Sequence, residues 1–463
     1  MSLWKIAWRS IQQRGWASLL TIFSMSLGVM LVSAVLSIHG VVSESFRGNA
    51  GLGYNMIVGA KGGRLQLTLN TVYYLSEPVE NIPYDYYLEF LTEERRLQEQ
   101  ADAGDLDLKR DGEFGEWVEL AIPVCLGDYY SRFRLVGTTP DFLNQLTYGP
   151  SSDRHFEFSA GENFKHKDDK CGYFGAVVGA TVARVENIQV GDVLAPTHGS
   201  IEGKRHGETF TVLGILKPTG TPNDRAVFIN MEGFYLMEGH AKPVKTEDGQ
   251  PAPPEEYEML PIAQREVTAI LVKSSMRVSR AMSVKINEGN QAQAVSPISE
   301  IYNLFDLIVG PIQNVLILLT VMICVVSGIS IWVSIYNSMS ERRKEIAVMR
   351  ALGAKRPTIM MIILLESVLL ALSGGLIGWF AAHASIAAVS PMIAERTGVS
   401  LGFWDMAPAV SLQELLWMEP TLPWLKVSTE LLLIPGLILL AIAVGFAPAM
   451  SAYRTDVAKA LAD

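Results

Sequence analysis

Four long apolar segments divide this chain of 463 residues, and they lie at residues 17–42, 309–336, 359–390 and 431–450. A helix of about 20 apolar residues spans the hydrocarbon core of a bilayer and satisfies its own backbone hydrogen bonds there. The pattern therefore predicts four transmembrane helices. Basic residues precede the first segment, as in a secretory signal peptide, but its apolar run is too long and lacks a small-residue cleavage site. We interpret it as a retained first span.

The first 16 residues have a helical periodicity. Trp4, Trp8 and Ile11 recur at i, i+4 and i+7, whereas Lys5 and Arg9 lie elsewhere on the helical wheel. Amphipathic helices with Trp and basic residues lie in the plane of the membrane interface. Residues 1–16 are therefore expected to form a cytoplasmic interfacial helix that turns into the first span.

The segment between the first two apolar segments, residues 43–308, has a strand-like pattern over much of its length. Short runs rich in Val, Ile, Thr and Phe end at Gly, Pro or Asp, and helical stretches lie between them. This mixture predicts an α+β domain. The strand-like runs lie at 120–127, 131–139, 175–181, 208–216, 225–231 and 267–275.

Charged residues predict the orientation of the spans. The loop at 337–358 contains six Lys or Arg residues against two Glu residues, and residues 1–16 contain three basic residues and no acidic one. Cytoplasmic loops carry such an excess of Lys and Arg. Residues 43–311 instead contain 38 acidic and 25 basic residues, which accounts for the net charge of −10. We therefore place 43–308 and the short loop 391–430 outside, and both termini, including the tail 451–463, in the cytoplasm.

The predicted fold class is a membrane protein, with an α-helical four-span domain and a large α+β extracytoplasmic domain inserted between spans 1 and 2. Within its cytoplasmic loop, residues 341–352 favour a short helix that is charged in its first turn and apolar in later turns. Ser340 can cap this helix, and Gly353 can end it in the left-handed conformation. Such a helix is suited to receive force from a soluble partner. Alternatively, its basic residues only set the orientation of the spans.

The chain has no nucleotide-binding loop of the GxxxxGK[ST] type at any position. It therefore does not look like its own ATPase. The sequence also contains no evident arrangement of nucleophile, base and orienting residue. We predict a non-catalytic chain with no catalytic residues and no cofactor of its own.

The sequence ERRKEIAVMRALGAKRPTI followed by LLESVLLALSGGLIG, together with the closing PAMSAYRTDVAKAL, resembles the FtsX/MacB-type permease family. These proteins are the transmembrane subunits of type VII ABC transporters. The outer segment GATVARVENIQVGDVLAP is similar to the extracytoplasmic core of the family in a looser way. The resemblance implies a multi-pass protein of the bacterial inner (cytoplasmic) membrane. It also implies a homodimer that contacts membrane lipids and no nucleic acid, and that works with two copies of a cytoplasmic ABC ATPase that binds ATP and Mg.

By the same resemblance, the ATPase docks on the helix in the loop 337–358. The residues that match the ATPase-facing helix of the family are Glu341, Arg342, Arg343, Glu345, Ile346, Met349, Arg350, Leu352 and Gly353. Three hypotheses for function follow. In the first, the permease exports or hands over a hydrophobic or amphiphilic substrate. In the second, it is a mechanotransmitter that regulates an extracytoplasmic partner, such as a cell-wall hydrolase, without transport. In the third, it is a membrane-anchored adaptor with no ATPase. A periplasmic adaptor or lipoprotein is a further candidate partner.

The third apolar segment contains one carboxylate and three closely spaced glycines. Glu366 is a functional candidate because ionisable residues inside a membrane are costly, but it can also pair structurally with the basic loop. Gly374, Gly375 and Gly378 allow close approach of a neighbouring helix, and we interpret them as packing residues.

Cysteine and histidine residues offer few further candidates. Cys324 lies in the second predicted span, whereas Cys125 and Cys171 share the outer domain, where an oxidising compartment permits one disulfide. The stretch that contains His155 and His166 is rich in acidic residues but lacks a recognised ligand spacing. We therefore predict no metal site.

Overall fold

The computed structural model describes residues 3–48, 52–102, 112–149, 153–237, 240, 259–304, 343–397, 402–407, 409–411 and 426–453, together with scattered positions from 307 to 336. The chain forms two compact units. The helical unit comprises Met1–Ser45 and Leu307–Asp463, and the outer unit comprises Phe46–Asp306. Each unit has its own hydrophobic core.

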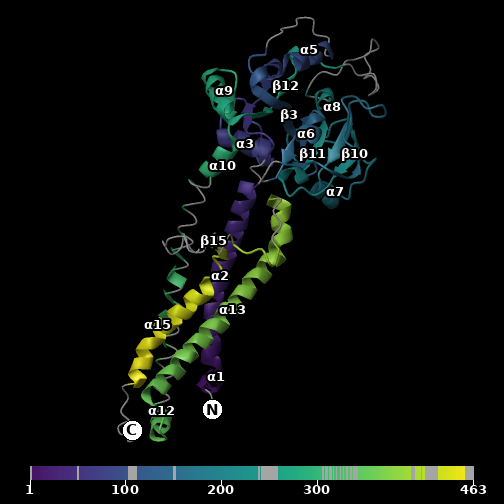
Figure 1. Cartoon of the computed structure of the whole chain (residues 1–463). Helices are drawn as coiled ribbons and strands as arrows, with labels where there is room; N and C mark the ends of the chain where they lie inside the picture. The colour runs from purple at the N-terminus through teal and green to yellow at the C-terminus, as the bar shows by residue number, and fades with distance from the viewer. Residues whose placement is uncertain are drawn as a thin grey trace. The chain divides into compact units, whose positions relative to one another are not determined.

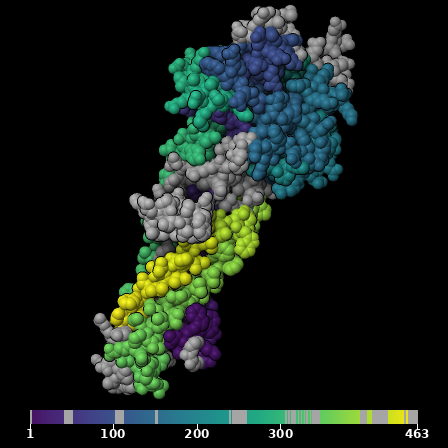
Figure 2. Space-filling model, in the orientation of Figure 1, coloured from purple at the N-terminus to yellow at the C-terminus, as the bar shows by residue number. Residues whose placement is uncertain are grey.

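Long helices build the helical unit. Helix α13 packs against both α15 and α1, and Figure 2 shows α15, in yellow, lying against part of α13. Two short strands form a separate ribbon in this unit. The elements are α1 (Leu3–Gln13), α2 (Gly15–Gly48), α12 (Arg343–Ala351), α13 (Arg356–Thr397), β15 (Ala409–Ser411), β16 (Lys426–Ser428) and α15 (Leu433–Tyr453).

Among the described residues, two helical segments are long and apolar enough to cross a membrane, Gly15–Gly40 and Arg356–Ile393. The apolar part of α15, Leu433–Phe446, is shorter. The predicted second span, 309–336, contains many positions outside the described residues, including Cys324, and its described positions from 311 onward are helical.

Helix α13 extends beyond the residues that the sequence predicts for the third span. It begins at Arg356 and continues through Pro391 to Thr397, whereas the predicted span is 359–390. A proline removes one backbone hydrogen bond, and neighbouring structure in a membrane helix can tolerate that loss. The helix therefore continues past residue 390, where the predicted span ends.

A ten-stranded sheet forms the centre of the outer unit, in the order β14-β1-β13-β3-β4-β11-β8-β10-β7, with β9 paired to β10. The pairs β4–β11 and β8–β10 are parallel, and the other pairs are antiparallel. The strands are β1 (Met56–Gly59), β3 (Val118–Tyr130), β4 (Phe133–Thr138), β7 (Phe158–Gly161), β8 (Gly175–Val178), β9 (Val193–Leu194), β10 (Phe210–Leu216), β11 (Ala226–Asn230), β13 (Ala269–Ser274) and β14 (Gln293–Val295).

The burial of these strands follows from their sequences. All residues of β4, β8 and β11 are buried, because strands in the middle of a sheet that is covered on both faces are shielded from solvent and are mostly apolar. Strand β10 instead alternates between buried and half-buried residues, as a strand with one covered face does. Each of the six strand-like runs identified in the sequence contains a strand, so the α+β prediction for this unit is confirmed.

Helices cover the sheet at several places. In the outer unit, α3 and α9 pack beside β14, and α8 packs on β3, β4 and β11 (Figure 1). The helices are α3 (Arg64–Tyr73), α4 (Tyr84–Leu88), α5 (Glu93–Asp102), α6 (Asp141–Gln145), α7 (Ala180–Glu186), α8 (Met231–Leu236), α9 (Met276–Glu288) and α10 (Pro297–Leu304). The short elements are β2 (Ile82–Pro83), η1 (Gly115–Trp117), β5 (Thr147–Tyr148), β6 (Arg154–His155), η2 (Pro222–Arg225), η4 (Ile262–Gln264) and β12 (Glu266–Val267).

Candidate functional site

Helix α12 has one buried and one exposed apolar face. Ile346 and Ala347 are 4% and 1% exposed, and Ile346 packs in a cluster with Ile359 and Ile363 of α13. Val348 and Leu352, four residues apart, are instead 47% and 84% exposed. Side chains at i and i+4 lie on the same side of a helix. The helix is therefore held on its own unit and presents an apolar pair to its surroundings.

The end of α12 has a defined geometry. The N–H of Gly353 donates to the carbonyl of Arg350, and the N–H of Ala354 donates to the carbonyl of Met349. This pair of bonds is a Schellman motif, and Gly353 has the left-handed φ of +102° that the motif requires. The exposed Leu352 therefore lies at a rigid corner between α12 and α13.

Several residues that the sequence assigns to ATPase coupling lie on this helix. Met349 and Arg350 are half-buried, and Gly353 is exposed. Arg343 and Glu345 belong to the first turn of α12. Glu341 and Arg342 lie outside the described residues.

Glu366 lies in a buried contact between α13 and the N-terminal helix. The hydroxyl of Ser10 donates a hydrogen bond of 2.7 Å to its Oε2 atom. The apolar face of α1, with Ala7 and Ile11, packs on α13 beside this bond. Because Glu366 is 5% exposed, this donor offsets part of the cost of burying a carboxylate. The contact joins the predicted interfacial helix to the third apolar segment.

The glycines of α13 lie where other helices come close. A Cβ atom on Gly374 would be 2.7 Å from Met25 Cβ, and one on Gly378 would be 2.5 Å from the backbone oxygen of Ser26. A Cβ atom on Gly375 would have its nearest neighbour on Ile434, at 3.6 Å. Gly374 and Gly378 therefore permit the close packing of α13 on α2, whereas Gly375 has room for a methyl group.

A buried histidine–carboxylate pair lies in the same unit, and the sequence analysis did not single it out. His383 Nε2 is 2.8 Å from Glu430 Oε2, and both side chains are fully buried. The hydroxyl of Ser37 donates to Glu430 Oε1 at 2.5 Å, and the N–H of Ala407 donates to the same oxygen. The pair links α2, α13 and the turn before α15. The sequence feature that could have identified His383 is a titratable residue within the third apolar segment.

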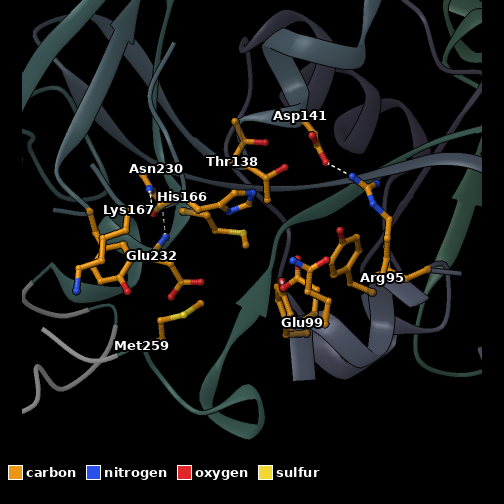
Figure 3. Close-up of a pocket in the computed structure, with 16 residues that line it drawn as sticks. Arg95, Glu99, Thr138, Asp141, His166, Lys167, Asn230, Glu232 and Met259 are labelled. Atoms are coloured by element: carbon orange, nitrogen blue, oxygen red, sulfur yellow. Dashed lines mark hydrogen bonds and ion pairs between the residues drawn. The ribbon is translucent and has the colours of Figure 1, made fainter. Parts of the chain in front are cut away.

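The outer unit contains a cavity of about 420 Å³. Arg95 and Glu99 of α5 lie on one side of it, and Lys167, Asn230 and Glu232 lie on the other side (Figure 3). Charged and aromatic side chains together make walls that can hold a polar or amphiphilic ligand. These residues come from distant parts of the chain, so no local pattern predicted the cavity.

Glu232 is the most perturbed carboxylate that lines this cavity. Burial raises its pKa to about 7, and the nearby Arg265 opposes that rise. Nη1 of Arg265 lies 2.8 Å from Glu232 Oε1, and the Arg265 side chain is fully buried. A carboxyl group that titrates near neutral pH in a cavity is a functional candidate.

The two cysteines of the outer unit are free in the structure and have separate partners. The Cys125 thiol donates to the hydroxyl of Tyr235, and burial raises its pKa to about 12. Cys171 lies beside Asp168, and burial raises its pKa to about 11. The structure therefore does not form the one disulfide that the sequence permits, and neither thiol is ionised near neutral pH.

Two family models match the chain. The model of the MacB-like periplasmic core domain matches residues 18–298, and the model of the FtsX-like permease C-terminal region matches residues 317–457. The first match covers the greater part of the outer unit, and the second covers α12, α13 and α15.

Two curated proteins are similar to this chain. One is an uncharacterized ABC transporter permease of Methanocaldococcus jannaschii, 26% identical over 193 residues, which are 41% of this chain and 42% of that protein. The other is the macrolide export ATP-binding/permease protein MacB of Rhodopirellula baltica, 27% identical over 150 residues, which are 32% of this chain and 20% of that protein. The chain thus matches less than half the length of either relative.

Proposed function

We propose that this chain, which belongs to the FtsX-like and MacB-like family of ABC transporter permeases, is the transmembrane subunit of a complex driven by a separate ATPase. Members of the family are embedded in the membrane and have a large outer domain, here the outer unit. The chain would couple ATP hydrolysis in a cytoplasmic partner to movement of that domain.

The exposed apolar face of α12 is the observation that carries this proposal. Ile346 and Ala347 anchor the helix, while Val348 and Leu352 remain exposed. Buried apolar anchors contribute most of the binding energy in protein interfaces. A partner that covers Val348 and Leu352 would therefore push directly on α13, which begins three residues after Gly353.

The proposed topology has four spans and both termini in the cytoplasm of a bacterial inner membrane. The basic residues on either side of α12 support this orientation. The two long apolar helices and the shorter apolar part of α15 support three of the four spans. Two copies of the permease would assemble with two ATPase subunits, which hold ATP and Mg.

Export or handover of an amphiphilic substrate is our preferred function. The cavity of about 420 Å³ in the outer unit is large enough for a small molecule. One of the similar proteins is named for macrolide export, which agrees with a substrate of this chemical class. The cavity is the observation that favours cargo.

A mechanotransmitter that acts on an extracytoplasmic protein is the second candidate. Helix α2 continues without a break from Gly15 to Gly48, beyond the predicted end of the first span. A continuous helix can transmit displacement along its axis. The length of α2 therefore supports a function in which the chain moves a partner protein.

Reconstitution with the ATPase distinguishes these functions. The full chain is coexpressed and purified with a candidate cytoplasmic ABC ATPase and reconstituted into lipid vesicles, and ATP hydrolysis is measured with amphiphilic compounds or with an extracytoplasmic protein partner. We expect the ATPase to copurify and amphiphilic compounds to stimulate hydrolysis. Stimulation by a protein partner alone would support mechanotransmission. A chain that copurifies with no ATPase would contradict both functions.

A further inference from the structure

Three histidines surround one buried aspartate in the outer unit. The group consists of Asp128, His198, His206 and His240, and its four ligand atoms all lie within 4.8 Å of one another. Asp128 lies on β3, and His240 follows α8. His198 and His206 belong to a short hairpin between β9 and β10. The proposed ABC function uses none of these residues.

Backbone hydrogen bonds hold the hairpin against β3. Thr197 and Tyr129 exchange two backbone bonds, with N···O distances of 2.7 and 3.0 Å. His198 and His206 lie at the base of the hairpin, where further backbone bonds close it. The pairing of β3 with β4 shifts register just before Tyr129, where Asp128 lies. The fold thus brings the side chains together by main-chain geometry.

The distances within the group fit a tetrahedral metal site. Asp128 Oδ2 lies 2.8 Å from His240 Nε2 and 3.0 Å from His206 Nε2. His198 Nδ1 lies 3.4 Å from Asp128 Oδ1 and 3.3 Å from His240 Nε2. Two ligands about 2.0–2.1 Å from one zinc ion lie roughly 3.3 Å apart at the tetrahedral angle. Each of these four distances is therefore close to the spacing that one ion requires, with His198 nearest to Asp128 Oδ1 and the other two histidines nearest to Oδ2.

His206 gives an independent indication of a ligand. Its Nε2 atom is buried, and among the described residues it has no hydrogen-bond partner, although Asp128 Oδ2 is only 3.0 Å away. The contact has the distance of a hydrogen bond but not its alignment. A buried ring nitrogen without a partner costs free energy. A metal ion between the nitrogen and the carboxylate would remove that cost.

Two neighbouring groups orient the ligands. The N–H of Gly199 donates to Asp128 Oδ1 at 3.2 Å, and the ring of His240 packs on Phe234 with 4.4 Å between centroids. Outer contacts of this kind fix the orientation of metal ligands in proteins. The Asp128 side chain is fully buried, whereas that of His198 is 53% exposed. An ion would therefore enter from the side of His198.

We propose that Asp128, His198, His206 and His240 bind one divalent transition-metal ion of the zinc class. Imidazole nitrogens suit zinc and its neighbours, whereas calcium and magnesium prefer oxygen ligands. Four protein ligands complete a tetrahedral shell and leave no open position, as in structural zinc sites. The ion would join β3, the hairpin and the segment after α8, and it would stabilise the outer unit without taking part in ATP coupling.

Metal binding by the full chain tests this proposal. The chain is purified in detergent without a histidine tag, stripped with a chelator, and titrated with zinc or cobalt, and bound metal is measured by mass spectrometry. We expect one ion per chain, a cobalt absorption spectrum typical of tetrahedral coordination, and a higher melting temperature with zinc. Loss of an outer contact typically weakens metal binding ~10–100-fold, and we expect the loss of one ligand to weaken it at least as much.

His198→Ala and His240→Ala are the informative variants, and His155→Ala is the matched control. His198 is half-exposed and His155 is exposed, so neither change should disturb the core. We expect weak zinc binding in both ligand variants, with the melting temperature of the stripped protein unchanged for His198→Ala. The proposal is overturned if the wild type binds no stoichiometric metal, or if His198→Ala binds zinc as tightly as His155→Ala does.

Discussion

The hydroxyl of Ser10 donates a buried hydrogen bond of 2.7 Å to the carboxylate of Glu366, across 356 positions of sequence. This bond joins α1, which is predicted to lie in the inner interface, to α13, which begins just after α12. We therefore expect motion imposed on α12 to reach α1 as well as α13.

Ser10→Ala should destabilise the helical unit. The substitution removes a donor from a buried carboxylate, and such a loss costs about 1–3 kcal/mol. Thermal unfolding of the full chain in detergent measures the effect. Ser385→Ala is the control, because the hydroxyl of Ser385 bonds only the carbonyl of Ala381 in its own helix among the contacts described. Equal melting temperatures for the two variants would mean that the Ser10 bond is not important for stability.

Leu352→Asp should weaken association with the proposed ATPase partner. Leu352 is 84% exposed, so a charge there leaves the fold intact but adds a desolvation cost in an apolar interface. We expect a loss of affinity of about tenfold or more, equivalent to about 1.4 kcal/mol or more. Copurification and ATP hydrolysis report this loss.

Met276→Asp is the control for that variant. Met276 is 88% exposed but lies on α9 of the outer unit, so its replacement should leave ATPase binding unchanged. If Leu352→Asp also retains full binding and hydrolysis, then the exposed face of α12 is not the docking site.

Gly378→Ala and Gly375→Ala should change stability in opposite directions. A Cβ atom on Gly378 would meet the backbone oxygen of Ser26 at 2.5 Å, so α13 and α2 must move apart. Overpacking of this kind costs about 1–3 kcal/mol. Gly375 has space for the methyl group, and alanine is better than glycine in a helix by about 0.5–1 kcal/mol. Thermal unfolding should thus rank Gly375→Ala above wild type and Gly378→Ala below it; the reverse order would refute the packing role of Gly378.

The stability of the outer unit should depend on the ionisation of Glu232. Its pKa is raised from an ordinary 4.5 to about 7 in the folded state, chiefly by burial. The folded state therefore binds the proton of Glu232 more tightly than the unfolded state does. The resulting contribution to the free energy of unfolding is fully present below pH 4.5 and is lost as the pH rises through 7. The size of the effect is about 3 kcal/mol.

Glu232→Gln should remove this part of the pH dependence. Hydrogen exchange of the β11 amides between pH 5 and 8, corrected for the intrinsic exchange rate, measures the stability of the outer unit in wild type and variant. Glu202→Gln, at an exposed position, is the control and should behave as wild type. Parallel pH profiles for wild type and Glu232→Gln would show that Glu232 does not titrate in this range.

Local signals predicted much of this protein. The end of α12 at Gly353 and six of the ten strands of the central sheet followed from patterns within a few residues. The family resemblance rested on short local motifs, chiefly the segment around α12 and the closing PAMSAYRTDVAKAL. The end of α13 was less predictable, because the apolar pattern of the predicted span ends at residue 390 whereas the helix continues through Pro391 to Thr397.

The sequence alone determined the apolar segments, the α+β character of the outer unit and the position of the candidate docking helix, because hydrophobic periodicity, charge and glycine stops act locally. Only the tertiary structure decided which side chains meet. Ser10 reaches Glu366, and Asp128 lies among three histidines, because helix packing and strand pairing bring distant segments together. Such contacts depend on the path of the whole chain, so no short window of sequence contains them.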